Sequence, residues 1–200
     1  NSFPMRGMTA FSMRCCKRGN LLAVLAALWL AFASYTPVRA EGIEVRKAML
    51  TIADDGYVLD ANFGIALTPP LEEALNKGVS LYFLFEFELI RSRWYWFNEK
   101  IANTQQRYRL SYNALTRQYR IGAGNLYQNF HTLGEALDVM SRVRRREDAE
   151  PGALARNETY TAAVRLRLDT TQLPKPFQIN ALGSRDWNIG SDWYRWTVTP

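Results

Sequence analysis

Two acidic residues, Glu86 and Glu88, stand in the most apolar and aromatic stretch of the chain, LYFLFEFELIRSRWYWF, which covers residues 81–97. On a strand, carboxylates two residues apart lie about 6.5 to 7 Å from each other at the backbone, a separation that glycoside hydrolysis allows. A glycan hydrolase of the cell envelope that uses Glu86 and Glu88 is therefore the enzymatic hypothesis.

A structural role for the same two glutamates is the preferred interpretation. Arginines recur at the same period of two in Arg107 with Arg109 and in Arg165 with Arg167. If one of those strands lies beside the glutamates, cross-strand ion pairs of roughly 0.2 to 1 kcal/mol each would fix the strand register. Such pairs keep carboxylates ionised, which does not suit a general acid. We therefore expect a protein that is not an enzyme.

Other chemical signatures are missing from the sequence. His131 is the only histidine, and the only cysteines are Cys15 and Cys16, near the start of the chain. There is no Gly-x-Ser-x-Gly elbow, no P-loop and no complete dinucleotide fingerprint. We expect no catalytic residues, no metal site and no cofactor.

Two similar aromatic clusters, residues 93–97 and 192–196, are the clearest hint of a binding function. Tryptophan, tyrosine and arginine dominate the hot spots of protein interfaces. The sequence therefore predicts a partner-binding site formed by Arg93, Trp94, Trp96, Trp193 and Trp196. The alternative is that these rings are buried at the ends of the fold.

The first 40 residues read as an export signal. Arg14, Lys17 and Arg18 precede an apolar run over residues 21–33, and Val-Arg-Ala at 38–40 fits a signal peptidase site. We expect cleavage after Ala40 and an exported domain over residues 41–200. The alternative is an uncleaved inner-membrane anchor, although the run is shorter than the roughly 20 residues that span a bilayer.

Removal of that segment changes the charge. It holds five of the 25 basic residues and none of the 19 acidic ones, so residues 41–200 carry 20 basic and 19 acidic side chains. Nucleic-acid binding requires a basic excess, and it is not expected.

Alternating patterns predict a mainly β domain. The strongest is at residues 79–90, where every odd position is apolar and the even positions turn polar at Glu86. Further strands are expected at 45–52, 57–67, 106–112, 116–121, 160–168 and 192–199, with a turn at Pro174 to Pro176.

Two short helices are expected between the strands. One begins at Thr68 and ends at Gly78. The other begins with a capping box at Thr132 and Glu135, buries Val143, and carries Arg142 and residues 144–146 at its C-terminal end. The sequence thus predicts an antiparallel, immunoglobulin-like β-sandwich with two crossover helices, or alternatively an open barrel.

Four motifs support a family resemblance: residues 74–79, the Arg-Trp-Tyr-Trp cluster at 93–96, residues 110–119 and residues 132–137. Together they resemble the exported proteobacterial domain-of-unknown-function family number 4390. The resemblance implies a protein in the periplasm or envelope of a Gram-negative bacterium, and members tend to be encoded near a membrane sensor kinase of the nitrogen-regulation type. It implies an accessory role beside an envelope or inner-membrane protein, and it supplies no active-site residues.

Overall fold

A computed structural model describes residues 42–53, 56–91, 99–148 and 158–199. These belong to one compact unit, Ala40–Pro200. The unit is mainly β, as expected, and its elements in chain order are β1 (Gly42–Ala53), β2 (Gly56–Ala66), α2 (Pro69–Asn76), β3 (Leu81–Arg91), β4 (Glu99–Asn113), β5 (Gln118–Ala123), β6 (Leu126–Phe130), α3 (Leu133–Met140), β7 (Arg142–Asp148), β8 (Tyr160–Leu168), η1 (Thr170–Gln172), α4 (Lys175–Gly183), η2 (Arg185–Trp187) and β9 (Tyr194–Val198). None of the described helices is both long and apolar enough to cross a bilayer.

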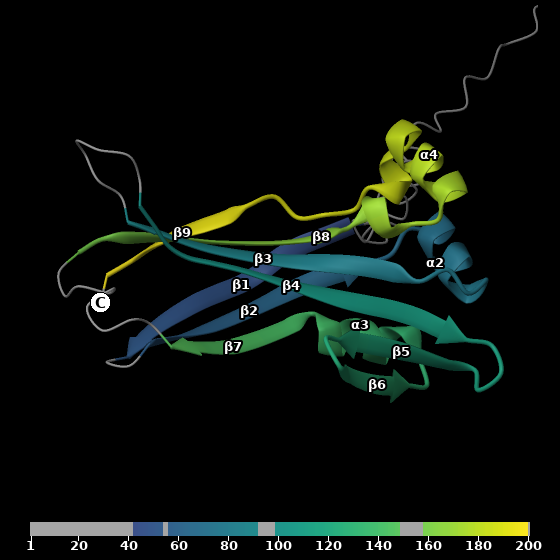
Figure 1. The fold of residues 1–200 in the computed structure, drawn as a ribbon, viewed down its shortest axis with the longest axis horizontal. Helices are drawn as coiled ribbons and strands as arrows, with labels where there is room; N and C mark the ends of the chain where they lie inside the picture. The colour runs from purple at the N-terminus through teal and green to yellow at the C-terminus, as the bar shows by residue number, and fades with distance from the viewer. Residues whose placement is uncertain (1–41, 54–55, 92–98, 149–157, 200) are drawn as a thin grey trace, which may run out of the picture. The chain divides into compact units, whose positions relative to one another are not determined.

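The strands form two antiparallel sheets, which can be followed in Figure 1. The smaller sheet has the order β1-β2-β7, and the larger has the order β6-β5-β4-β3-β8-β9. The central strand of the larger sheet is β3, which pairs with β4 on one side and β8 on the other. The described strands thus form two separate sheets and not the open barrel that was the alternative prediction.

The core lies between the inner faces of the two sheets. The odd residues of β3 from Leu81 to Leu89 are buried, as the alternation of residues 79–90 predicts, and so are the odd residues of β2. Two ring contacts join these faces, Phe63 with Phe85 at 6.0 Å and Tyr57 with Phe87 at 5.6 Å. The even residues of β3 therefore lie on the face turned away from the core, which we call the outer face of the larger sheet.

Helix α2 forms where it was expected, with Pro69 and Pro70 in its first turn and Gly78, at φ 92°, just beyond its end. Thr68 stands at the N-cap position, but its side chain makes no capping hydrogen bond. The Thr68 hydroxyl donates instead to the carbonyl of Asp186 at 2.6 Å, which ties α2 to η2. Both α2 and α4 lie at the end of the sheet where β3 begins and β8 finishes (Figure 1).

Helix α3 has the predicted capping box but is shorter than expected. The Thr132 hydroxyl accepts from the Glu135 N–H, and the Glu135 carboxylate accepts from the His131 N–H. The helix then ends at Met140, and the prediction that Val143 and the following arginines continue it is wrong. Those residues form β7, because the backbone of β2 pairs with them from Asn62 to Gly56.

Two further differences concern α4 and β6. The expected turn at Pro174 to Pro176 instead leads into α4. Pro174 stands just before the helix and Pro176 lies in its first turn, where proline is tolerated because the N–H groups there have no intrahelical partner. Strand β6 was not expected from the sequence, and it pairs with β5 from Phe130 opposite Tyr119 to Leu126 opposite Ala123.

Candidate functional site

The outer face of the larger sheet concentrates basic side chains. Strand register places Arg107 and Arg167 on either side of Leu84, and Arg165 beside Glu86. Over the described part of this face, the basic residues are Lys100, Arg107, Arg109, Arg120, Arg165, Arg167 and Arg195, and the acidic residues are Glu86, Glu88 and Asp169. The face thus has seven basic residues and three acidic ones, whereas residues 41–200 as a whole have 20 and 19.

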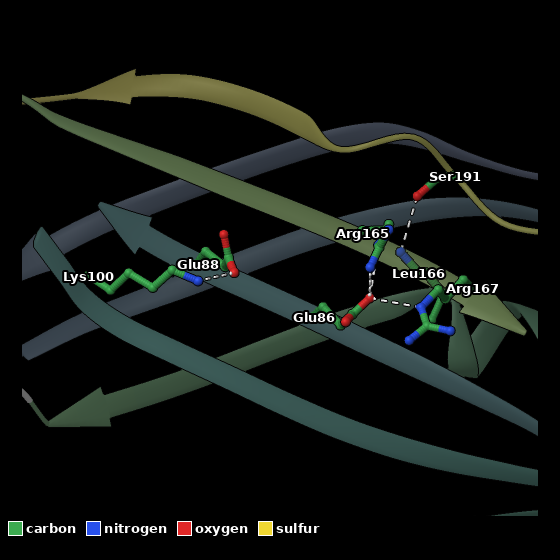
Figure 2. Close-up of polar contacts among 7 residues, drawn as sticks. All are labelled: Glu86, Glu88, Lys100, Arg165, Leu166, Arg167 and Ser191. Carbon is green, nitrogen blue, oxygen red and sulfur yellow. Dashed lines mark hydrogen bonds and ion pairs between the residues drawn. The ribbon is translucent and has the colours of Figure 1, made fainter. Parts of the chain in front are cut away.

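Glu86 is the anchor of this face. Its Oε2 atom accepts from Nε and Nη2 of Arg165 at 2.8 and 2.6 Å and from Nε of Arg167 at 3.0 Å (Figure 2). Its side chain is only 9% exposed, whereas the two arginines are 27% and 38% exposed. The predicted ion pairs between the glutamate and the 165–167 strand are therefore confirmed at Glu86.

The predicted arginine ladder does not extend to Glu88. Its carboxylate pairs with Lys100 Nζ at 2.9 Å, as Figure 2 shows. Arg107 instead faces Asp169, with 3.6 Å between Nη2 and Oδ2, and Arg109 donates to the Ser80 hydroxyl. The physical reason is the strand register, which sets Asn103 and Ala163 opposite Glu88. A register shift at Leu89 and Ile90 then brings Lys100 to the outer face near Glu88.

Aromatic rings lie against several of these arginines. The guanidinium carbon of Arg165 is 4.5 Å from the ring centroid of Trp193, and that of Arg195 is 6.0 Å from the same ring. Farther along the sheet, Arg109 stacks on Tyr82 at 5.8 Å and Arg120 on Tyr127 at 5.9 Å. Planar guanidinium groups held on rings are well placed to donate hydrogen bonds to anionic groups of a partner.

The segment before β9 fixes Trp193 in place. Ser191 exchanges hydrogen bonds with Leu166, since its Oγ accepts from the Leu166 N–H at 3.1 Å and its own N–H donates to the Leu166 carbonyl at 2.9 Å. Gly190 forms an isolated antiparallel β-bridge with Arg167, and a Cβ at Gly190 would lie 2.9 Å from the Cβ of Arg167. The close approach of this segment to β8 therefore depends on the glycine.

The residues of the predicted partner-binding site are separated by strand alternation. Trp193 and Arg195 lie on the outer face, but Trp196 is paired opposite the buried Ala162 and packs against the core. Both tryptophans are half-buried. Arg93, Trp94 and Trp96 lie outside the described residues. Partner binding at these positions stays a prediction, and the arginines around Trp193 are the neighbours that the sequence reasoning missed.

The site offers ionic and aromatic contacts. Among the described residues, no group of three or more histidine, cysteine, aspartate or glutamate side chains could hold a metal ion. The arrangement can bind negatively charged or planar groups through unshared guanidinium N–H donors.

Fold and site together define a mainly β domain of two antiparallel sheets with a basic, aromatic outer face. Over residues 40–197 the chain matches the model of a family described as a domain of unknown function (DUF4390). The chain belongs to this family, in agreement with the resemblance of its sequence motifs. No curated protein and no solved structure matches the chain.

Proposed function

We propose that this chain is an exported, non-enzymatic binding module of the Gram-negative periplasm that binds an envelope or inner-membrane protein through the outer face of its larger sheet. The observation that carries the proposal is the surplus of arginines on that face, several of them stacked on aromatic rings. Arginine and aromatic residues are the types that contribute most to protein interfaces, and a charged surface also steers the encounter of partners.

The arrangement of Glu86 supports binding over catalysis. One oxygen of this carboxylate is committed to two guanidinium groups. A glycan hydrolase needs one carboxyl group that carries a proton and a second that faces the substrate. Glu86 and Glu88 instead hold neighbouring cations in place, which suits a surface built to present arginines.

The immunoglobulin-like sandwich is part of the proposal. It is supported by the shared core of the two sheets and by the ring contacts between β2 and β3. Sandwich domains of this kind serve as binding modules in many contexts, so the fold by itself fits the function without specifying it.

The partner we propose is a membrane sensor protein, for which this domain acts as an accessory. The support is the family's association with sensor kinases of the nitrogen-regulation type, together with the predicted export signal over residues 1–40. In that location the basic outer face would meet an acidic surface on the periplasmic part of the partner.

Crosslinking in living cells, followed by purification of the protein from its own envelope, tests the proposal. Trp193→Ala and Arg195→Glu remove contacts of the outer face, and Trp94→Ala with Trp96→Ala tests the other predicted cluster. Arg185→Glu, an exposed arginine in η2, is the matched control for charge reversal. We expect the wild type and the control to capture the same membrane protein and the outer-face variants to lose it.

Capture that is equally strong in all folded variants would assign the partner to another surface. Wild-type protein that captures nothing specific would overturn the binding function. The N-terminal residue of the envelope-purified protein tests cleavage after Ala40 in the same sample.

A further inference from the structure

The edge formed by β6 differs from the other sheet edges of the described fold. Edge strands leave alternate N–H and C=O groups without a strand partner, and natural proteins commonly protect them with charges or proline. The edge strands β1, β7 and β9 all carry charged residues. Strand β6, Leu-Tyr-Gln-Asn-Phe, has neither a charge nor a proline. This edge is therefore open to the addition of another strand.

The side chains of β6 are also exposed on both faces of the sheet. Leu126 is 77% exposed and Tyr127 is 63% exposed, and only Phe130, near α3, is buried. Register assigns Leu126 and Gln128 to the inner side and Tyr127 and Asn129 to the outer face. An added strand would thus meet an apolar side chain on one side and polar groups on the other.

Arg120 gives this edge a charge preference. The side chain of Arg120 extends from β5 over β6, where its Nε donates to the Asn129 Oδ1 at 2.9 Å and its guanidinium lies 5.9 Å from the Tyr127 ring centroid. No carboxylate in the described part of the chain pairs with it. A further strand would lie about 4.8 Å beyond β6, so a carboxylate on its outer side could reach the guanidinium.

We propose that β6 binds an extended segment of a partner protein by strand addition, and that this segment alternates apolar residues with acidic ones. Main-chain hydrogen bonds to β6 supply affinity, while Leu126 and Arg120 select the side chains. The site shares Arg120 and Tyr127 with the outer face, but the β6 backbone lies at the opposite edge of the larger sheet from β9 and the proposed contact around Trp193. It therefore does not depend on that contact.

A pair of synthetic peptides tests the proposal. One alternates valine with glutamate and the other alternates valine with lysine, and each is titrated into isotope-labelled protein while the amide signals are followed by NMR. We expect the glutamate peptide to shift the signals of residues 126–130 and to protect their amides from hydrogen exchange. The lysine peptide should bind much more weakly to the wild type.

Reversal of one charge provides the specificity test. Arg120→Glu should weaken binding of the glutamate peptide about tenfold, as expected for the loss of one charge-assisted pair, and should strengthen binding of the lysine peptide. Arg185→Glu makes the same charge change away from β6 and should alter neither. If Arg120→Glu does not fold, the ratio of the two peptide affinities on the wild type still measures the preference.

Three results would overturn the proposal. They are the absence of any peptide effect at residues 126–130, equal binding of both peptides, and self-association through β6, seen as concentration-dependent broadening of those signals without peptide. Loss of the membrane partner from the Trp193→Ala variant bears only on the outer-face function. Each proposal can therefore fail while the other stands.

Discussion

At the scale of single residues, Glu86 shows how an acidic side chain is accommodated in an apolar strand. Its carboxylate is nearly buried, but it compensates two arginines that are only partly covered. A buried charge without a partner is costly, so the three side chains depend on one another. Glu88 differs, because its partner Lys100 is mostly in solvent.

The first prediction compares these two glutamates. Glu86→Gln should lower the free energy of unfolding by about 1 to 3 kcal/mol, because Arg165 and Arg167 lose their charged acceptor. Glu88→Gln, the matched control, should cost no more than about 1 kcal/mol, as for other exposed ion pairs. Urea denaturation at pH 7 measures both values. Equal losses in the two variants would contradict the anchoring role of Glu86.

The second prediction concerns Tyr108, which is partly buried against the core. Burial raises the pKa of its phenol above the usual value, with nearby Arg145 opposing the shift. The stabilisation that comes with a raised pKa is present below the unfolded-state pKa of about 10 and is lost as pH rises through the folded-state pKa. In Tyr108→Phe, the free energy of unfolding should therefore fall less steeply above pH 10 than in the wild type. Thermal or urea unfolding from pH 8 to 11 measures the difference. If the free energy of unfolding depends on pH identically in both proteins, Tyr108 does not have a raised pKa.

At the scale of elements, β6 depends on a contact between a glycine and a tyrosine. Gly122 on β5 is paired opposite Tyr127, and a Cβ at Gly122 would lie 2.9 Å from a ring carbon of Tyr127. The third prediction is that Gly122→Ala displaces this ring, loosens β6 and speeds amide exchange of residues 126–130. Gly134→Ala is the control, because a Cβ there meets no atom within 4 Å. Unchanged exchange at β6 in Gly122→Ala would show that the ring contact does not hold the strand.

Comparison of expected and observed elements shows which patterns carry information. The alternation on β3 was informative because one face meets a continuous core. Likewise, the strands expected at residues 106–112 and 116–121 overlap β4 and β5, which pair with Tyr112 opposite Tyr119 and Leu110 opposite Ile121. A strand can be predicted from the sequence when its burial alternates strictly, because the strands paired on both sides of it have the same alternation of inner and outer residues.

Strand β7 shows why the rest could not be predicted. Leu133, Ala136 and Met140 have helical spacing, and Val143 continues it by three residues. What ends α3 is the need of β2 for a strand partner, as in the hydrogen bond from the Phe63 N–H to the Ser141 carbonyl. Such a tertiary contact is invisible to a local pattern.

The contacts of the candidate site were predictable only where they follow a regular strand pattern. The pairing of Glu86 with Arg165 follows from matching periods of two on neighbouring strands. The pairing of Glu88 with Lys100 depends on the register shift near Leu89, and the stacking of Trp193 on Arg165 depends on the Gly190 segment. Both are irregularities, which a repeating pattern does not contain.

At the scale of the whole domain, residues 41–200 combine near-neutral charge with a strongly uneven distribution of that charge. Over its described part, the outer face carries seven basic residues to three acidic ones, whereas residues 41–200 as a whole have 20 and 19. An oriented field of this kind directs the approach of a partner, and raised ionic strength weakens it.

The fourth prediction is that the Ala40–Pro200 unit, whose core includes residues of both sheets, unfolds as one cooperative domain. Phe85 is fully buried and touches Phe63 across the core, so Phe85→Ala should lower the free energy of unfolding by about 3 to 5 kcal/mol. Because both sheets bury the same core, they should unfold together in the variant as in the wild type.

Amide signals of Leu59 in β2 and Leu110 in β4 report on each sheet during urea denaturation. Coincident transitions would establish one cooperative domain, and a smaller sheet that melts first would show that the two sheets are stable separately. Leu115→Ala, at a residue that is 96% exposed, is the control and should leave both transitions unchanged.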